Sequence, residues 1–180
     1  MLAQTPQNNS SALSRRHLII GIASLASVGF LAGCDSTRPL ASADPPPAPT
    51  TNFEVTHTDA EWRQRLTAQQ YDILRNAGTE TPFTSPLNGE HRNGVFSCAG
   101  CDLAAFSSAA KFDSGTGWPS FWKAIDNAVH EQSDNSLGMT RTEVQCRRCG
   151  GHLGHVFNDG PPPTGLRYCM NGAALNFRAT

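Results

Sequence analysis

The residues of this 180-residue chain that are best suited to chemistry lie near its C-terminal end, around Cys169. Arg167 and Asn171 flank the cysteine at two positions' distance, and three further polar residues precede it: His152, His155 and Asp159. The thiolate is the reactive form of cysteine, and nearby positive charge favours it. Because alternate residues of a strand share a face, Arg167 is expected to stabilise the thiolate, with a surface salt bridge as its alternative role. Asn171 is expected to hydrogen-bond into the same site.

The two histidines are three residues apart in a segment with strand composition. An ideal strand places such residues on opposite faces, so a β-bulge or Gly154 must redirect one of them. Beside a reactive thiol, His155 and His152 are candidates to donate protons or to hold a water molecule; otherwise they are ordinary polar strand residues. Asp159 is interpreted either as a residue that orients a histidine or binds the polar end of a substrate, or as a plain turn residue.

Four further cysteines form two Cys-x-x-Cys pairs, namely Cys98 with Cys101 and Cys146 with Cys149. Two such pairs are typical of a closed zinc site with four cysteine ligands, which has no open coordination position and is therefore structural. We expect one Zn²⁺ per chain. Two disulfides are the alternative in an exported domain. A thioredoxin-type redox pair is disfavoured, because no strand–helix–strand pattern surrounds either motif.

The N-terminal segment has the features of a targeting signal. Arg15 and Arg16 form a twin-arginine (Tat) pattern, although the residues that usually follow it are missing, so the general secretory route stays open. The apolar run 18–32 is shorter than the roughly 20 residues of a membrane span. It ends in a sequence that resembles a bacterial lipoprotein cleavage box, which implies cleavage before Cys34 and lipidation of its sulfur. An uncleaved apolar anchor is the alternative.

These features divide the chain into a signal peptide at 1–34, a linker at 35–54 and a folded domain at 55–180. The linker is rich in proline, alanine and serine, a composition that forms an extended tether rather than a packed core. The prediction is an exported lipoprotein whose domain hangs from a lipid anchor at the periplasmic face of a bacterial membrane. The net charge of −1 gives no electrostatic reason to expect nucleic-acid binding.

The pattern of the domain predicts a mainly β fold with short N-terminal helices. Residues 58–76 favour two helices that break at Leu66/Thr67, where Thr67 and Gln70 fit a capping box, and Gly78 is expected to end the second. Short segments with strand composition follow, separated by turns, and predict an antiparallel β sandwich or open barrel. They are 95–97, 104–106, 128–130, 139–145, 152–157, 167–170 and 174–177.

Three stretches, read with the two Cys-x-x-Cys pairs, closely resemble the methionine-R-sulfoxide reductase family of the MsrB type. They are KFDSGTGWPSFW at 111–122, GHLGHVFNDG at 151–160 and LRYCMNG at 166–172. The resemblance spans roughly 61–177. It implies an MsrB-like fold, repair of methionine damaged by oxidative stress, and action on protein-bound and free methionine-R-sulfoxide. It also implies that the Cys169 thiolate becomes a sulfenic acid, and that Trp118 packs on the substrate methyl group.

One position departs from the family pattern. Many members carry a second cysteine where this chain has Thr116, and that cysteine resolves the sulfenic acid as a disulfide. With four thiols on zinc and Cys34 on lipid, Cys169 has no partner in the mature chain. We therefore expect a monomeric one-cysteine reductase that is regenerated by an external thiol, such as a thioredoxin-like donor. The alternatives are a non-catalytic zinc-stabilised β module that binds a peptide or ligand, and a thiol peroxidase.

Overall fold

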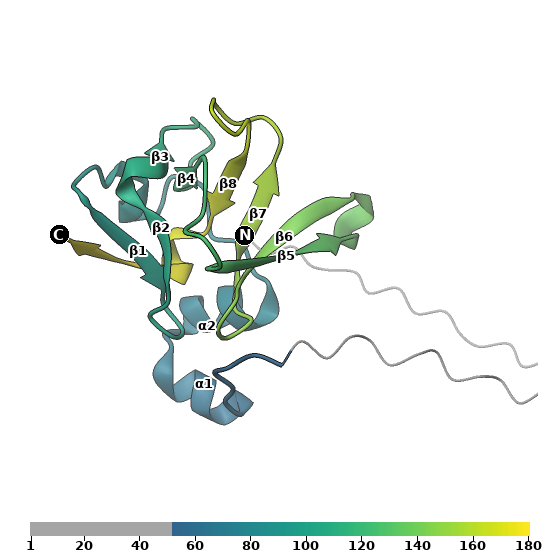
Figure 1. Cartoon of the computed structure of the whole chain (residues 1–180). Helices are drawn as coiled ribbons and strands as arrows, with labels where there is room; N and C mark the ends of the chain where they lie inside the picture. Colours follow the sequence, from purple (N-terminus) through teal and green to yellow (C-terminus); the bar gives the residue numbers. More distant parts are fainter. Residues whose placement is uncertain (1–51) are drawn as a thin grey trace, which may run out of the picture. The chain divides into compact units, whose positions relative to one another are not determined.

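The computed structural model of the chain describes residues 52–180 (Figure 1). The predicted export signal, the lipidation at Cys34 and most of the predicted linker lie outside these residues. Among the residues described, no helix combines the length and apolar character that crossing a membrane requires. Near the start of the described chain, the ring of Phe53 lies against Gly150, and the amide of Val55 donates to the carbonyl of Arg148 at 2.9 Å.

Two short helices open the folded part, α1 (Asp59–Arg65) and α2 (Ala68–Asn76). The predicted break between them is confirmed, and each helix begins with a complete capping box, Thr58 with Glu61 and Thr67 with Gln70. The expectation that Gly78 ends α2 is wrong. Ala77 takes the left-handed conformation of the C-cap instead, with φ of 54°. The sequence pointed to glycine because glycine alone adopts that conformation without steric cost.

The strands form two antiparallel sheets, in keeping with the predicted mainly β class. The smaller sheet has the order β2-β1-β9, with β1 at Gly94–Cys98, β2 at Ala104–Ser107 and β9 at Leu175–Ala179. The larger has the order β3-β4-β8-β7-β6-β5. Its strands are β3 (Lys111–Phe112), β4 (Ser120–Phe121), β5 (Val129–Asp134), β6 (Arg141–Cys146), β7 (His152–Phe157) and β8 (Arg167–Met170). Short 3₁₀ turns are η1 (Pro86–Gly89), η2 (Ser108–Ala110), η3 (Ser136–Gly138) and η4 (Gly172–Ala174).

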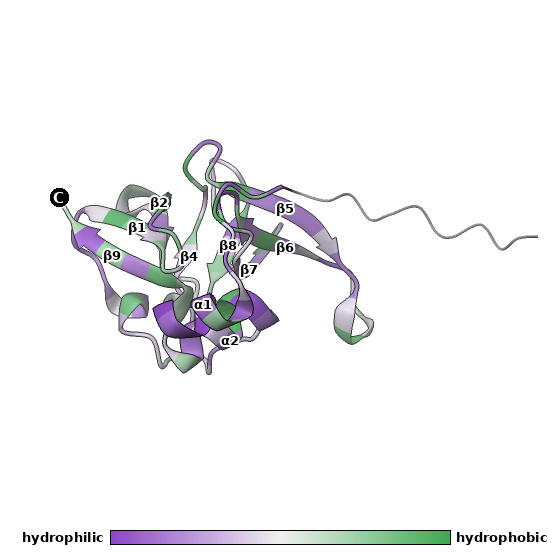
Figure 2. Cartoon of the chain, turned by 90° about the horizontal axis from the view of Figure 1, so that it is seen from below, coloured by the Kyte–Doolittle hydropathy of each residue, from purple (hydrophilic) through white to green (hydrophobic). Residues whose placement is uncertain are grey.

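The predicted bounds of β7 and β8 match the structure, while the predicted segment 128–130 extends to Asp134 as β5. Strands β3 and β4 were not predicted, because two residues are too few to show an alternation. The hairpin of β5 and β6 extends away from the rest of the larger sheet (Figures 1 and 2), which explains the polar composition of both strands.

An aromatic cluster joins the two sheets. Phe96 of β1 and Phe106 of β2 are fully buried against Phe121 of β4, with ring centroids 5.0 and 4.5 Å from that of Phe121. Phe106 also contacts Tyr168 of β8, at 5.8 Å between centroids. Burial of each such ring contributes about 2–3 kcal/mol to stability. This cluster therefore fixes β8, the strand that carries Cys169, against the smaller sheet.

The left-handed C-cap of α2 yields a stability prediction. We expect Ala77→Gly to raise the free energy of unfolding by about 1 kcal/mol, because an alanine in this conformation is disfavoured by roughly 1–2 kcal/mol and glycine is not. Urea denaturation with linear extrapolation measures the change. Ala60→Gly, inside α1, serves as the matched control and should lower stability by about 1 kcal/mol. A loss of stability in Ala77→Gly would contradict the assignment of the cap.

Candidate active site

Cys169 lies in β8, between one residue of β4 and one of β7 in directly opposite register. Its directly paired neighbours are Ser120 of β4 and His155 of β7. Directly opposite residues of antiparallel strands lie on the same face, with Cβ atoms about 4.5–5.5 Å apart. The sheet therefore places an imidazole beside the thiol on one side and a hydroxyl on the other. Cys169 itself is partly exposed.

The two histidines reach the same region because β7 carries a bulge. Val144 of β6 pairs with Gly154 but the next residue, Gln145, pairs with His152, so Leu153 is the extra residue. The histidine rings consequently pack edge to face, with centroids 5.3 Å apart. Gly154 permits this path, since a Cβ there would lie 2.2 Å from the carbonyl oxygen of Cys169. The predicted need for a bulge is confirmed.

The ring of His155 is held by Asp134, the last residue of β5. His155 Nε2 lies 2.8 Å from Asp134 Oδ2. Hydrogen bonds from Ser136, and then from His155, hold the pKa of Asp134 far below its usual range, so the carboxylate accepts the Nε2 hydrogen. Burial lowers the pKa of His155 and outweighs the opposing effect of Asp134. At neutral pH the ring is therefore uncharged, with Nδ1 as a free acceptor.

His152 is more deeply buried and has its own carboxylate, Glu143 of β6. His152 Nδ1 lies 2.7 Å from Glu143 Oε1. This hydrogen bond, supported by Gln132, lowers the pKa of Glu143 to about 2. His152 Nε2 is buried and has no hydrogen-bond partner among the described residues. The second histidine thus has a ring fixed by Glu143, and unlike His155 it is not among the residues that line the cavity beside Cys169.

Asp159 pairs with Arg167 and not with a histidine, which corrects one of the two roles expected for it. Arg167 Nε and Nη2 donate to the two carboxylate oxygens at 2.8 and 2.9 Å. The hydrogen bond to Asp159, and then the charge of Cys169, raise the pKa of Arg167. The guanidinium also lies over the ring of Phe157, 4.4 Å from its centroid. Asp159 therefore fixes a cation next to the thiol.

A cavity of about 140 Å³ opens onto Cys169. Its walls include two aromatic side chains, Trp118 and Phe157, and the indole Nε1 of Trp118 donates to the carbonyl of Glu80 at 3.1 Å. The other lining residues are Thr79, Arg141, Gly154, His155, Cys169 and Asn171. A larger hollow of about 590 Å³ lies beside α2 and η1 but is lined by neither a cysteine nor a histidine. The smaller cavity is therefore the candidate active site, because Cys169 and His155 line it.

Asn171 lines this cavity, yet its side-chain amide forms hydrogen bonds with the backbone. Asn171 Oδ1 accepts from the amide of Glu80 at 3.0 Å, and Nδ2 donates to the carbonyl of Leu153 at 3.3 Å. The buried carboxylate of Glu80 in turn accepts from the amides of Gly172 and Ala173 in η4. Asn171 and Glu80 therefore tie the end of β8 to the loop behind Trp118.

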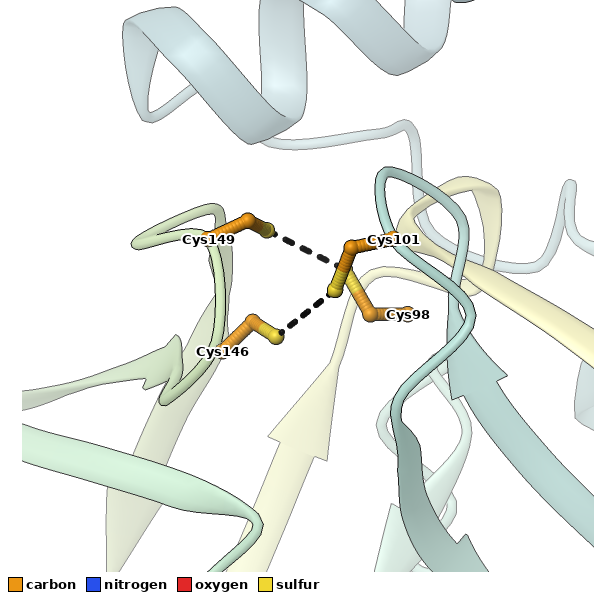
Figure 3. A group of neighbouring side chains, drawn as sticks. All are labelled: Cys98, Cys101, Cys146 and Cys149. Atoms are coloured by element: carbon orange, nitrogen blue, oxygen red, sulfur yellow. Dashed lines mark hydrogen bonds between the residues drawn. The ribbon is translucent and has the colours of Figure 1, made fainter. Parts of the chain in front are cut away.

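The four remaining described cysteines gather in two turns that face each other (Figure 3). All four sulfur atoms lie within 4.8 Å of one another, with Cys98–Cys149 at 3.7 Å and Cys101–Cys146 at 3.5 Å. A disulfide needs about 2.05 Å, so the disulfide interpretation does not hold. Tetrahedral thiolates about 2.3 Å from a central ion would be separated by about 3.8 Å, which these distances fit. The cluster could therefore hold a metal ion.

Several residues of this site were not predicted from the sequence. Phe157 stands two positions after His155 on the same strand, and strand alternation could have identified it. Asp134 and Glu143 meet the histidines only through the register of β5, β6 and β7, which leaves no local signal. Glu80 is a lone acidic residue in a loop, and nothing in its neighbourhood marks it as buried.

Known proteins resemble this chain over nearly all of its described length. The family model described as "SelR domain" matches residues 66–179. A "Peptide methionine sulfoxide reductase MsrB" from Thiobacillus denitrificans is 59% identical over 121 residues, which cover 67% of this chain and 92% of that protein. Proteins of the same name from Leptospira interrogans and Agrobacterium fabrum are each 53% identical over 128 residues, or 71% of this chain and 98% and 95% of theirs. The chain therefore belongs to the MsrB family of peptide methionine sulfoxide reductases, whose shared domain is the SelR domain.

Proposed function

We propose that this protein reduces methionine-R-sulfoxide, in proteins and as the free amino acid, to methionine. The observation that carries the proposal is the setting of Cys169. The thiol faces a small cavity with two aromatic walls and lies directly across from an uncharged histidine and near a fixed arginine. The names of the relatives agree with this activity. A module that only binds peptides has no use for such a thiol.

In the proposed reaction, Nδ1 of His155 takes the proton of the Cys169 thiol, and the thiolate attacks the sulfoxide sulfur. The resulting imidazolium, held by Asp134, returns the proton to the departing oxygen. The S–S bond formed by the attack then breaks as the protonated oxygen passes from the substrate sulfur to Cys169. The S–O bond of the substrate is thereby exchanged for an S–O bond on Cys169. The products are a sulfenic acid and the thioether, so the cysteine is oxidised by two electrons and methionine sulfoxide is reduced by two.

The other residues are proposed to bind and to orient. Trp118 and Phe157 pack on the S-methyl group and exclude water. Arg167, held by Asp159, stabilises the thiolate through its charge. His152 supports the ring of His155, against which it packs edge to face, while Asn171 keeps the end of β8 in place. Each role matches the contacts described above, although Asp159 acts through Arg167 alone.

Regeneration is proposed to need an external thiol. Thr116 Oγ1 lies 3.7 Å from Cys169 Sγ, at the position where many relatives carry the resolving cysteine, and the other described cysteines belong to the metal cluster. An incoming thiol, from a thioredoxin-like or another donor, condenses with the sulfenic acid to a mixed disulfide and releases water. A second thiol then displaces Cys169 as a free thiol.

The four-cysteine cluster is proposed to bind one structural Zn²⁺. All four ligand positions are taken by sulfur, which leaves no place for substrate or water. Bound zinc would stabilise the folded state by cross-linking the chain, and it would take no part in the reaction. Each pair begins with the last residue of a strand and ends in the turn after it, β1 for Cys98 and Cys101 and β6 for Cys146 and Cys149. The ion would therefore hold the two sheets together.

We further propose that the protein is an exported, lipid-anchored monomer on the periplasmic face of a bacterial membrane. Support comes from the twin-arginine pattern, the lipoprotein-like box at Cys34 and the proline-rich linker. A tethered domain could reach proteins near the membrane. Export through the Tat route would allow zinc to be loaded before transport, because that route carries folded proteins.

The activity makes a stereochemical prediction. With dithiothreitol as the reductant, the purified protein should consume the R epimer of methionine sulfoxide and leave the S epimer. Cys169→Ser should lower the rate by on the order of 10³-fold or more, since serine is a far weaker nucleophile. Chromatographic separation of methionine from its sulfoxide measures both. Unimpaired turnover in Cys169→Ser would refute the role of the thiol, and binding without turnover in the wild type would favour the binding module.

Metal analysis tests the second proposal. We expect one zinc per chain by atomic emission spectroscopy, and no metal in Cys146→Ser. Loss of the ion should lower Tm by on the order of 10 °C or more, because the binding free energy of structural zinc is part of the folding free energy. Cys169→Ser is the matched control and should keep both the zinc and the Tm. A metal-free wild type of unchanged stability would overturn the assignment.

A further inference from the structure

A chain of three hydroxyl groups leads from the buried strand β4 to the sulfur of Cys169. Ser120 Oγ lies 2.7 Å from Ser114 Oγ, which lies 2.8 Å from Thr116 Oγ1. Thr116 Oγ1 lies 3.7 Å from Cys169 Sγ, a normal separation for a hydrogen bond that involves sulfur. Ser120 is fully buried at the far end, where its hydroxyl also reaches the carbonyl of Trp118 at 3.1 Å.

Each of these hydroxyls has one hydrogen to donate, so the chain has two self-consistent directions. With Cys169 as a thiol, the S–H donates to Thr116, and the donors then run through the serines to the carbonyl of Trp118. With Cys169 as a thiolate, the three hydroxyls reverse, and Thr116 donates to the sulfur. The reversal needs only rotation about C–O bonds, and no proton passes from one residue to another.

We propose that Thr116 is a catalytic residue of the reduction, and that Ser114 and Ser120 are positioning residues that set the direction of its hydroxyl. Thr116 donates to the Cys169 thiolate before attack and to the oxygen of the sulfenic acid after it. The proposal rests on the proposed function, because it assigns a step of that reaction. Hydrogen bonds to a charged acceptor are stronger than neutral ones, which makes this contact worth most when the thiolate is formed.

The same contact has a second consequence for a reductase with one cysteine. Its sulfenic acid must persist until an external thiol arrives, and further oxidation to sulfinic acid is irreversible in most proteins. A hydroxyl that is hydrogen-bonded to the sulfenic acid, and fixed from behind by Ser114, restrains that group in one orientation. A threonine in place of a resolving cysteine therefore retains a role in the second half of the cycle.

Paired variants test this inference. Thr116→Val removes the hydroxyl at nearly constant shape, and Thr116→Ser restores it. We expect Thr116→Val to lower the single-turnover rate of sulfoxide reduction about 10-fold, and Thr116→Ser to stay within about 3-fold of the wild type. Ser114→Ala should show part of the loss of Thr116→Val, because it frees the direction of the Thr116 hydroxyl.

A readout without a sulfoxide separates this inference from the proposed function. The rate at which iodoacetamide alkylates Cys169 at neutral pH, followed by mass spectrometry of the peptide that contains it, should fall in Thr116→Val and recover in Thr116→Ser. This holds even if the protein reduces no sulfoxide. Equal alkylation rates in the wild type and Thr116→Val would overturn the proposal, as would a Thr116→Ser variant as slow as Thr116→Val.

A second inference comes from the exposed apolar residues of the described chain. Three large apolar side chains are exposed, Phe83 (69%), Leu137 (81%) and Met139 (52%). Leu137 and Met139 lie in the turn that joins β5 to β6, and Figure 2 shows partly hydrophobic colouring of the ribbon at the tip of that hairpin. The hairpin carries Arg141, which lines the cavity. We call the three side chains the apolar rim.

Phe83 lies against Gly117, the residue that precedes Trp118. Its amide donates to the carbonyl of Gly117 at 2.7 Å, and its ring lies so close to Gly117 that a Cβ there would be 2.8 Å from it. Phe83 has a φ of 65°, which is unfavourable for an aromatic residue. The fold thus keeps a strained, solvent-facing ring next to the residue proposed to bind the S-methyl group. Such outliers often mark functional contacts.

We infer that the apolar rim contacts the neighbours of an oxidised methionine within a polypeptide. The cavity of about 140 Å³ suits a methyl sulfoxide end, so the flanking residues of a protein substrate must lie across its mouth. Apolar neighbours would bury surface against Phe83 and the hairpin tip, whereas polar neighbours would gain nothing. This inference deepens the proposed function by assigning a sequence preference to its protein substrates.

Two acetylated pentapeptides with a central methionine-R-sulfoxide, flanked by leucine or by serine, test the rim. The wild type should favour the leucine peptide in kcat/KM, and Phe83→Ala should reduce that preference about 5-fold, as expected for the loss of roughly 40 Å² of buried apolar surface. Leu137→Ala tests the tip of the β5–β6 hairpin in the same way. An equal loss for both peptides would assign Phe83 a structural role, and a wild type without preference would also overturn the inference.

Equilibrium binding keeps this test independent of turnover. The affinities of the two sulfoxide peptides for Cys169→Ser, measured by fluorescence polarisation, should differ in the same direction as the rates. A double variant, Cys169→Ser with Phe83→Ala, should lose that difference. If the wild type binds the leucine peptide more tightly but reduces neither, the proposed reduction fails while the rim stands.

Discussion

The site depends on contacts between two distant parts of the chain, and the four-cysteine cluster lies where these parts meet. Cys98 is the last residue of β1 in the smaller sheet, and Cys101 lies in the turn after it. Cys146 is the last residue of β6 in the larger sheet, and Cys149 lies in the turn after it. The sulfur atoms of these distant pairs lie within 4.8 Å of one another. Strand β7 starts three residues after Cys149 and carries both histidines. A metal ion held at this point would fix where β7 begins. Trp62 of α1 and Leu74 of α2 belong to the same buried core as these cysteines.

The register of the larger sheet determines which side chains meet at the site. Each histidine receives a carboxylate from the projecting hairpin, Asp134 from β5 and Glu143 from β6. Both carboxylates stay ionised, so each accepts a hydrogen from the ring nitrogen that faces it. The cation is supplied separately by Arg167, which Asp159 holds in place. An uncharged base and a fixed cation can then act on one sulfur without repelling each other. A charged imidazole at the position of the base would repel the guanidinium.

The sequence sufficed for those parts of the fold and site that rest on local signals. A capping box revealed the break between the two helices, paired cysteines revealed the cluster, and strand composition between turns revealed β7 and β8. Long-range contacts left no such signal. The role of Glu80 is evident only from the hydrogen bonds that its carboxylate accepts from the amides of η4. Strand β4 carries Ser120, the partner of Cys169, but it is too short to show an alternation of apolar and polar residues. Ala77 shows the reverse problem, since the left-handed C-cap of α2 holds an alanine where local preference favours glycine.

The exchange of a resolving thiol for a hydroxyl changes the kinetics of the whole cycle. A thiol at position 116 would attack the sulfenic acid within the same molecule, at a high effective concentration. Thr116 is within hydrogen-bonding distance of Cys169 but cannot form a disulfide, so that step becomes bimolecular. Its rate then depends on how readily a reductant reaches a partly exposed sulfur at the end of a small cavity. The aromatic walls that favour the substrate methyl group thus also decide which thiols can complete the reaction.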